Sequence, residues 1–551
     1  MNLSSKHQQN IVSYSDFTGG LNTTTVPEMI SDNQMADCCN MEFNRTTGAL
    51  QTCCGSATVF NCPESINIDN LFYDEINNVF LFADNSTKAV YKSCLIDMDG
   101  SHNFDREKIG SLSGSKEPTA VMWDNGMLIA SGGRLQYWNG STLTAIKITF
   151  EDEQKSYSWE SVGETLPEGK TADDFALDTY YTKNESYVRY DGKYYLCKES
   201  HTSVSDCPSK CDGVFIKNGR VYIWHEYRLH CSGVGDARCW YDVSGDDSTS
   251  KWLDIGYKEG ENEQAYITGA CALSSDIVVI KNDGKIYRLT GEYPDWTLKE
   301  IARNITCLNS RCFTAIQDGV FIVGREGMFF LQTTVDYGDM KPANVANGIL
   351  SLISTLSVDQ SWVKFLPTLN QIWIAGYENK FICFDLNVKA FFQRKFYSAV
   401  NDICAYKGYT MLARNHRVTE LMDGIYQDEK YSDDESDMDW NVVAKSHTDF
   451  YDFLLKRIRV AYVPLLDTFE SAQVLTAEDR IYVDMAASKT KTPEIYGDAN
   501  LIVDDDSYLF PMNTQFNTKW CVYRNRSFGV KLKGQASAIM LNKIDMAVTE
   551  V

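Results

Sequence analysis

The chain has 551 residues, of which 44% are hydrophobic and 12% aromatic, which excludes global disorder and predicts about two to four domains. Its net charge of −23 argues against a protein that holds nucleic acid through clustered Lys and Arg. The 17 cysteines are an odd number, so we expect reduced thiols, many of them buried, in a chain that folds in a reducing cytoplasm.

Residues 1–59 read as an irregular N-terminal arm. Gly19-Gly20 interrupts regular structure, and Pro27 fixes an extended segment. Asp32-Asn33 predicts the cap of a short helix that runs through Cys39. We expect such an arm to pack on its own domain or on a neighbouring subunit.

Residues 60–430 repeat one short pattern, in which a strand of four or five residues, a turn and a second strand follow a small or polar pair. The copies begin at Asn77, Asn125, Asn218, Ser275, Asp318, Asn370 and Lys407. Their first strands are marked by Val79, Met127, Val221, Ile277, Val320, Ile372 and Tyr409, at steps of 48, 94, 56, 43, 52 and 37 residues. A propeller blade takes roughly 40 to 50 residues, and these intervals leave room for two more strands each.

The repeat therefore predicts an all-β chain with a six- or seven-bladed β-propeller. A stack of β-sandwich domains would also give regularly spaced hairpins, but the repeats have no linkers between them. The one double-length step is explained by an inserted small β module at residues 151–204.

The insertion contains the aromatic hairpin from Tyr187 to Cys197 and resembles small chitin-binding modules of the carbohydrate-binding type. That resemblance implies that Trp159, Tyr190 and Tyr195 could stack on sugar rings. Because aromatic rings also fill the core of a domain this small, we expect a packing role for all three.

Soft-metal ligand types overlap the insertion at Cys197, His201, Cys207 and Cys211. Structural zinc sites usually place cysteine pairs two to four residues apart, so this spacing is unusual. We therefore predict no metal site and no cofactor for the chain.

An acidic connector at residues 431–440 follows the last repeat and is expected to be solvated. Residues 441–551 start a new series of strands, with alternating segments from Arg457, Arg480 and Phe528. They predict a C-terminal β-sandwich-like domain.

The arm also carries a resemblance to known proteins. The matching residues are Phe17, Gly19, Gly20, Leu21, Asn22, Pro27, Ile30, Asp32, Asn33, Gln34, Asn40, Gly48, Ala49, Leu50 and Gly55. Their order, a double glycine, a DNQ segment, an asparagine and a G-x-L turn, resembles the opening of tail nozzle and connector propeller proteins of tailed phages. These are the tail tubular protein B-like proteins and the DNA-stabilising tail proteins. One departure is Cys53-Cys54, where such proteins often have a basic residue before the final glycine.

The resemblance implies a structural virion protein that is assembled in the host cytoplasm and forms a ring, expected to be hexameric, in the phage tail. It would contact other tail or connector proteins and would conduct or retain double-stranded DNA during packaging and ejection. An acidic lumen would let the duplex slide without binding, although the same charge is equally consistent with a role in solubility alone. Residues 1–20 lack the apolar region of a secretory signal, and no apolar run is long enough to span a bilayer.

The sequence offers no catalytic constellation. G-x-S-x-G, H-E-x-x-H, a P-loop and the S-x-D-x-G-x-x-W box of sialidase-type propellers are all absent. His225 and His230, near Cys231, are interpreted as packing or surface residues. We therefore predict a non-enzymatic protein, with a glycan-binding adhesin acting through residues 151–204 as the alternative and a propeller glycosidase as a remote third.

Overall fold

The repeated hairpins are built by turns that need a left-handed backbone. The computed structural model describes residues 9–44, 46–94, 106–243, 245–259, 264–274, 276–316, 319–333, 340–430, 432, 434–465, 471–476, 483–486, 494–496, 514–535 and 538–550. In five of the repeats the turn that leads into the first strand of the repeat has a positive φ, at Asn78 (53°), Asp124 (48°), Asn218 (50°), Asn370 (51°) and Lys407 (44°). Asn and Asp tolerate this conformation better than most residues, so the turn positions are encoded locally.

Seven four-stranded antiparallel blades of a propeller follow from these hairpins in the described part of the chain. Six of them are separate sheets, and the four strands of blade 6 are one end of a larger sheet that continues into the C-terminal strands. Blade 1 contains β7 (Asn70–Asp74), β8 (Val79–Asp84), β9 (Ala89–Cys94) and β10 (Arg106–Ser111); blade 2 contains β11 (Thr119–Trp123), β12 (Gly126–Ala130), β13 (Gln136–Trp138) and β14 (Leu143–Ala145). Blade 3 contains β21 (Gly213–Lys217), β22 (Arg220–His225), β23 (Arg228–Cys231) and β24 (Lys251–Asp254); blade 4 contains β25 (Ile267–Ala272), β26 (Asp276–Lys281), β27 (Ile286–Thr290) and β28 (Thr297–Ala302).

The remaining blades complete the circle. Blade 5 contains β29 (Phe313–Ile316), β30 (Gly319–Gly324), β31 (Gly327–Thr333) and β32 (Met340–Asn344); blade 6 contains β33 (Val363–Leu366), β34 (Gln371–Ala375), β35 (Lys380–Asp385) and β36 (Ala390–Lys395); blade 7 contains β37 (Asp402–Tyr406), β38 (Tyr409–Ala413), β39 (Arg417–Met422) and β6 (Gly55–Asn61). Each of the seven predicted markers lies in the second strand of a blade, and the all-β propeller prediction is confirmed with seven blades.

The last blade is closed by a strand from the other end of the sequence. β6 pairs antiparallel with β39, with Arg417 opposite Asn61 and Met422 opposite Gly55. The predicted boundary between arm and propeller, at residue 60, is therefore wrong, because the propeller's closing strand begins at Gly55.

The rest of the N-terminal segment joins the C-terminal strands. These N-terminal elements are β1 (Gln9–Tyr14), β2 (Gly20–Leu21), β3 (Gln34–Cys39), β4 (Met41–Phe43) and β5 (Leu50–Thr52). The C-terminal elements are β42 (Asp439–Ala444), β43 (His447–Pro464), β44 (Ser471–Thr476), β45 (Val483–Ala486), β46 (Glu494–Tyr496), β47 (Thr514–Gln535) and β48 (Ile539–Glu550). β1 pairs with β48 and β3 pairs with β42, and we call this unit the C-terminal β domain.

Two expectations for these segments need correction. The helix predicted from Asp32-Asn33 through Cys39 is wrong, because Gln34–Cys39 is strand β3, held by pairing with β42 about 400 residues later. The connector at 431–440 is not solvated throughout, since β40 (Gln427–Asp428) pairs with β41 (Ser436–Asp437) and Trp440 is 1% exposed. Some predicted positions lie outside the described residues. They are residues 431 and 433 of the connector, the first residues of the repeats at Ser275 and Asp318, and residues 480–482 of the strand predicted from Arg480.

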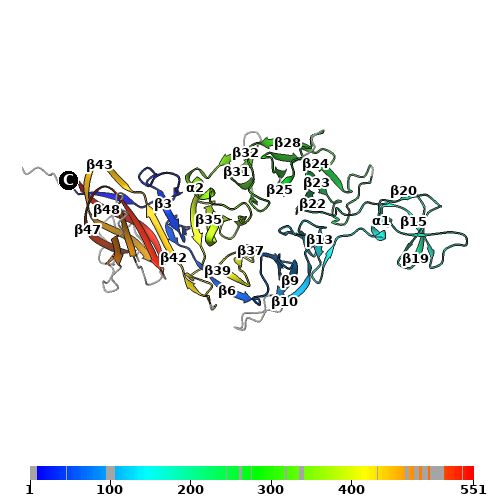
Figure 1. Ribbon diagram of the computed structural model, residues 1–551, viewed down its shortest axis with the longest axis horizontal. Helices are drawn as coiled ribbons and strands as arrows, with labels where there is room; N and C mark the ends of the chain where they lie inside the picture. Colours follow the sequence, from blue (N-terminus) through cyan, green and yellow to red (C-terminus); the bar gives the residue numbers. More distant parts are fainter. Residues whose placement is uncertain are drawn as a thin grey trace, which may run out of the picture.

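The insertion forms a module, residues 150–204, between blades 2 and 3. Its elements are α1 (Phe150–Ser156), β15 (Trp159–Gly163), β16 (Asp173–Asp174), β17 (Tyr180–Tyr181), β18 (Tyr187–Tyr190), β19 (Lys193–Cys197) and β20 (His201–Thr202). Short helical segments η1 (Asn347–Ile349) and α2 (Leu350–Ile353) precede blade 6, and η2 (Tyr377–Asn379) lies within it. The propeller lies between the C-terminal β domain at one end of the molecule and the module at the other (Figure 1).

Candidate functional site

The residues of the phage-tail resemblance lie where the N-terminal segment passes between the propeller and the C-terminal β domain. We call this region the joint: residues 19–61 and the strands of blades 6 and 7 and of the C-terminal β domain that contact them. Gly20 has a φ of +70°, and a Cβ there would lie 2.7 Å from the Cβ of Ala390 and 2.9 Å from the nitrogen of Phe391. Glycine is therefore required both by the backbone conformation and by the close approach of β36.

Asn40 connects two strands of the joint, β36 and β42. Its own φ is 56°, and its backbone N–H donates to the Gln393 carbonyl over 2.8 Å. Its side-chain oxygen accepts from the Lys395 N–H at 2.7 Å, and its Nδ2 donates to the Asp439 carbonyl at 2.6 Å. One asparagine thus satisfies the backbone of β36 and of β42 at the point where the blade 6 sheet continues into the C-terminal β domain.

A buried charge network holds the closing strand of blade 7. The Arg414 Nη2 lies 2.6 Å from Asp428 Oδ1, with the two side chains 2% and 1% exposed. Ser56 of β6 donates from Oγ to the same Asp428 oxygen over 2.7 Å. A second pair, Arg417 with Glu429, lies beside it at 2.6 Å. The sequence did not predict this network, because charged side chains such as Arg414, Arg417, Asp428 and Glu429 are usually exposed to solvent.

Polar side chains from distant blades meet at one mouth of the propeller axis. Arg311, just before blade 5, lies 3.5 Å through Nη1 from Oε1 of Glu117, just before blade 2. Asn85 of blade 1 donates to Glu117 over 2.9 Å, and its N–H donates to Asp69 over 2.8 Å. Burial, followed by nearby Asp84 and Glu117, raises the pKa of Asp69. Because blades 2 and 5 face each other across the seven-bladed circle, these side chains span the axis at this mouth.

The aromatic residues of the module surround one buried ring. Phe150 is 0% exposed, and its ring centroid lies 4.7 Å from that of Tyr195, 5.2 Å from Trp159 and 5.3 Å from Tyr190. The three residues considered as sugar-stacking candidates are thus partly buried against the module core, as the packing interpretation expects. Phe150 itself, which organises the core, was not singled out in the sequence because it precedes the aromatic hairpin.

A recess of about 400 Å³ lies beside this core and is lined by Asp174, Phe175, Arg189, Tyr190, Asp191 and Gly192. Arg189 Nε pairs with Asp174 Oδ1 at 3.0 Å, and both side chains are exposed. The recess therefore combines two aromatic rings with an exposed ion pair. Of the sugar-stacking candidates, Tyr190 lines it and the other two do not.

The four residues with soft-metal ligand types, Cys197, His201, Cys207 and Cys211, do not come together at one site. Cys197 belongs to the module core, whereas Cys207 and Cys211 are in the hydrophobic cluster between blades 2 and 3. Burial raises the pKa of Cys207 to about 12, which keeps it a thiol. Among the described residues no group of three His, Cys, Asp or Glu side chains is placed to hold a metal ion.

His201 is instead held by Glu153 of α1. Its Nε2 lies 2.6 Å from Glu153 Oε1, and its Nδ1 lies 2.5 Å from the Glu199 carbonyl oxygen. Tyr157 stacks on the imidazole with ring centroids 3.9 Å apart, and Glu153 Oε2 accepts the Val204 N–H at 2.8 Å. An imidazolium can donate to both oxygens at once, whereas a neutral ring can donate to only one. The pair fixes both ends of the module against each other.

The histidines of blade 3 do not form an acid–base pair with Cys231. His225 Nδ1 lies 3.0 Å from Asp212 Oδ2. His230 lies between Ile223 and Trp252 in the ladder, and burial, with nearby Arg228, lowers its pKa to about 4. Cys231 is 0% exposed. The fifteen cysteines whose side chains are described are all free and thirteen are buried, which confirms the predicted thiols for these residues.

Comparison with known proteins adds a fold likeness only. No family model and no curated protein matches the chain. Among solved structures, the WD40 β-propeller domain of Doa1 is 9% identical with a TM-score of 0.35, covering 67% of this chain and 97% of that one. BamB from Moraxella catarrhalis is 8% identical with a TM-score of 0.35, covering 70% and 94%, and the N-terminal domain of Nup159 is 8% identical with a TM-score of 0.35, covering 69% and 97%. Structural likenesses at TM-scores this low do not establish the fold, and the propeller assignment is based on the sheet topology. None of the helices in the described ranges is long and apolar enough to cross a membrane.

Proposed function

We propose that the chain is a non-enzymatic structural component of a tailed-phage virion. It assembles as a homo-oligomeric ring, hexameric by the resemblance, in the tail nozzle or head-to-tail connector, and it conducts or retains DNA. The observation that carries this proposal is the joint: Gly20 and Asn40, which belong to the resembling pattern, make the contacts that fasten the propeller to the C-terminal β domain. A ring subunit must hold its parts in fixed relative positions, and these residues supply that connection.

The distribution of charge supports a passive conduit. Residues 1–440 carry a net charge of −22, whereas residues 441–551 carry −1. Most of the acidity therefore belongs to the propeller, its insertion and the connector, because residues 1–54, which join the C-terminal strands, contribute only −3 of the −22. In a ring whose propellers face the lumen, phosphates would meet like charge and the duplex would slide without being bound.

The path for DNA in this proposal is the lumen between subunits. The axis of the propeller is spanned at one mouth by Arg311 and Glu117, and Asn85 and Asp69 are hydrogen-bonded beside them. A duplex that used the propeller axis would have to displace these side chains. The lumen of a ring has no such constraint.

Electron microscopy of the purified full-length chain, with native mass spectrometry, tests the ring. The proposal expects closed rings of uniform subunit number. It also expects that free duplex DNA will not bind to the purified protein in gel-shift titrations at physiological salt. A chain that stays monomeric at the concentrations of assembly, or that binds duplex DNA tightly, would contradict it. The location in the particle is tested by labelling the C-terminal β domain in intact virions.

A glycan-binding role for the module is a second candidate, favoured by the recess beside Tyr190. Phe175 and Tyr190 offer ring faces, while Asp174, Arg189 and Asp191 offer hydrogen-bonding groups at its edge. Binding on a glycan array that is lost when residues 151–204 are deleted would support it. Binding that survives the deletion would exclude the module as its source. The two candidates are compatible, because a ring protein can carry a peripheral sugar-binding module.

A further inference from the structure

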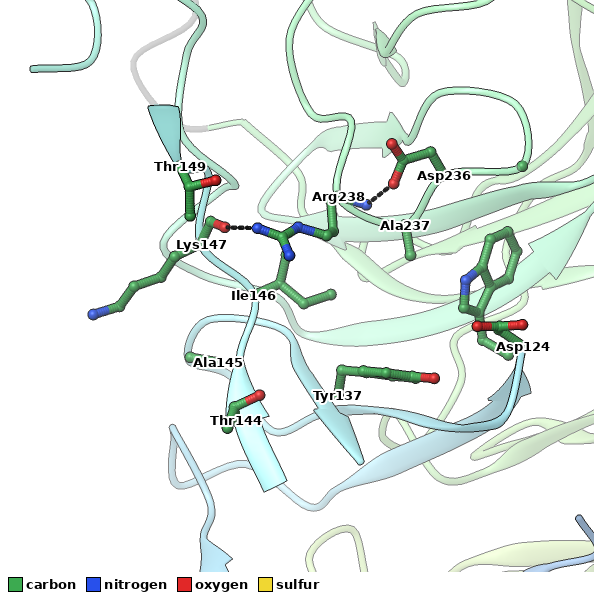
Figure 2. Close-up of a pocket in the computed structure, with 12 residues that line it drawn as sticks. Asp124, Tyr137, Thr144, Ala145, Ile146, Lys147, Thr149, Asp236, Ala237 and Arg238 are labelled. Carbon is green, nitrogen blue, oxygen red and sulfur yellow. Dashed lines mark hydrogen bonds between the residues drawn. The ribbon is translucent and has the colours of Figure 1, made fainter. Parts of the chain in front are cut away.

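A larger pocket lies in the propeller itself, between blades 2 and 3 at the root of the module. Its volume is about 750 Å³. Residues that line it include Trp123, Tyr137 and Thr144 of blade 2, Lys147 of the segment that leads to the module, and Ala237 and Arg238 of the loop after β23. Figure 2 shows Tyr137 on one side of this space and Ala237 and Arg238 on the other. None of these residues lines the recess of the module.

The floor of the pocket is an aromatic surface that the strand register creates. Tyr137 of β13 is opposite Leu128, which is opposite Val121 of β11, so Tyr137 and Val121 share one face of the blade. Trp123 lies two residues beyond Val121 and therefore presents its side chain to that same face. Its partner is Gly126, which has no side chain, and a Cβ at Gly126 would lie 1.8 Å from the Trp138 carbonyl oxygen. Both rings are half-buried and thus accessible from the pocket.

Of the two cationic side chains that line the pocket, Lys147 and Arg238, Arg238 is held by neighbouring groups. Arg238 Nη2 donates to Asp152 Oδ2 over 2.9 Å and to the Lys147 carbonyl over 3.4 Å. Asp236 accepts the Arg238 backbone N–H over 2.8 Å. The Lys147 side chain points away from Tyr137 (Figure 2). The pocket therefore presents no cluster of free cations that would select a phosphate or another polyanion.

The remaining groups favour one class of ligand. Trp123 and Tyr137 offer apolar ring faces, and the Asp124 carboxylate and Thr144 hydroxyl offer hydrogen-bonding groups at the edge. A sugar ring has an apolar face and a rim of hydroxyls, which matches this arrangement. A quaternary ammonium could also use aromatic faces and a carboxylate, but it would fill only a small part of a pocket of about 750 Å³. We propose that this pocket binds a short neutral oligosaccharide, with Trp123 and Tyr137 stacking on its sugar rings. The site is independent of ring assembly and of the module's recess.

Titration of the full-length protein with short neutral oligosaccharides of hexose and N-acetylhexosamine units, first on an array and then by calorimetry, tests the proposal. Trp123→Ala and Tyr137→Ala should each weaken binding about tenfold or more, because each removes a stacking face. Tyr137→Phe keeps the ring and should bind nearly as well as the wild type. Circular dichroism and the thermal midpoint check that each variant is folded.

The matched control is Tyr180→Ala in the module, at a side chain that is 65% exposed and lines neither the pocket nor the recess, which should leave this binding unchanged. Loss of binding in Tyr190→Ala but not in Trp123→Ala would assign the ligand to the module and overturn the proposal. Binding of choline in place of every oligosaccharide, or no binding at all by the folded wild type, would overturn it as well. The oligomeric state, measured on the same samples, separates these outcomes from failure of the ring proposal.

Discussion

The joint and the module, at opposite ends of the propeller, are held by different kinds of contact. At the joint, strands from residues 19–61 pair with strands that follow about 350 to 490 residues later, and Arg414 and Asp428 are buried together. The module folds around its own ring, Phe150. It is attached through two chain crossings, the ion pairs of Asp152 with Arg238 and of Lys155 with Asp236, and the packing of Tyr157, Leu177 and Val204 on the cluster between blades 2 and 3. The joint is therefore made by the whole chain, whereas the module is made by about fifty consecutive residues.

These two kinds of contact predict how far the destabilising effect of a substitution extends through the molecule. A change at the joint removes contacts shared by blade 6, blade 7 and the C-terminal β domain, so its effect should be global. A change in the module core should be confined to the module, because few of its contacts reach the blades. Local opening of small, separately packed units is a general property of proteins.

The largest expected effect is at the joint. Arg414→Met leaves the buried Asp428 carboxylate without its partner and should lower the free energy of unfolding by about 3–5 kcal/mol. Urea denaturation followed by tryptophan fluorescence measures the change. Arg303→Met, at an exposed pair with Glu300, is the control and should leave the midpoint in place. Equal midpoints for Arg414→Met and the wild type would mean that the network does not stabilise the joint.

A change of similar size should stay local in the module. Phe150→Ala removes the ring that Trp159, Tyr190 and Tyr195 contact, at a cost of about 3–5 kcal/mol. Because a unit this small has little stability to lose, hydrogen exchange should become fast across residues 150–204 and remain slow in blades 4 to 7. Tyr180→Ala, at a side chain that is 65% exposed, should change neither region. Fast exchange in the joint of Phe150→Ala would show that the two regions are not independent.

Low pH should lower the stability of the protein through His230 of blade 3, which lies next to the module. The pKa of His230 in the folded state is lowered to about 4, so the unfolded chain binds a proton in a pH range where the folded chain does not. Stability is therefore fully present above about pH 6.5 and falls as the pH drops toward 4, by at most about 3 kcal/mol. His230→Gln should flatten this dependence in denaturation curves at stepped pH. An unchanged slope in that variant would assign the acid sensitivity to other groups.

The smallest expected effect compares two glycines with nearly the same backbone. Gly20 at the joint has a φ of +70°, and a Cβ there would have three atoms of β36 at 2.7 to 3.0 Å, whereas Gly192 in the module has a φ of +73° and no atom within 4 Å. Alanine is strained at both, but only Gly20→Ala adds the clash with β36, so it should be less stable than Gly192→Ala by about 1–3 kcal/mol. Thermal unfolding measures the difference. Equal losses would show that β36 can move away from the joint.

The sequence predicted the parts of the fold that neighbouring residues determine. The seven hairpins were visible because strand alternation and turns at positions such as Asn218 and Asn370 act over a few residues. β3 was predicted as a helix because its cap signal at Asp32-Asn33 is local, while its pairing with β42 is not. The closing strand β6 was missed for the same reason.

The sites follow the same rule. The rings of Trp159, Tyr190 and Tyr195 were correctly expected to pack in the module, since a short aromatic hairpin has little else to bury. The pocket between blades 2 and 3 was not predicted, because Trp123 and Tyr137 come from different strands and meet only through the register of β11, β12 and β13. The Glu153–His201 pair likewise joins residues from the two ends of the insertion.

Closure of blade 7 by β6 also sets the order of events during synthesis. β6 leaves the ribosome early, but its partner β39 is completed only when residue 422 has been made, about 360 residues later. At about 5–20 residues per second, the strand waits for roughly 20 to 70 s with an unpaired edge. A chain truncated before Arg417 can never complete its last blade. The circle of blades can therefore close only after the whole propeller has been translated.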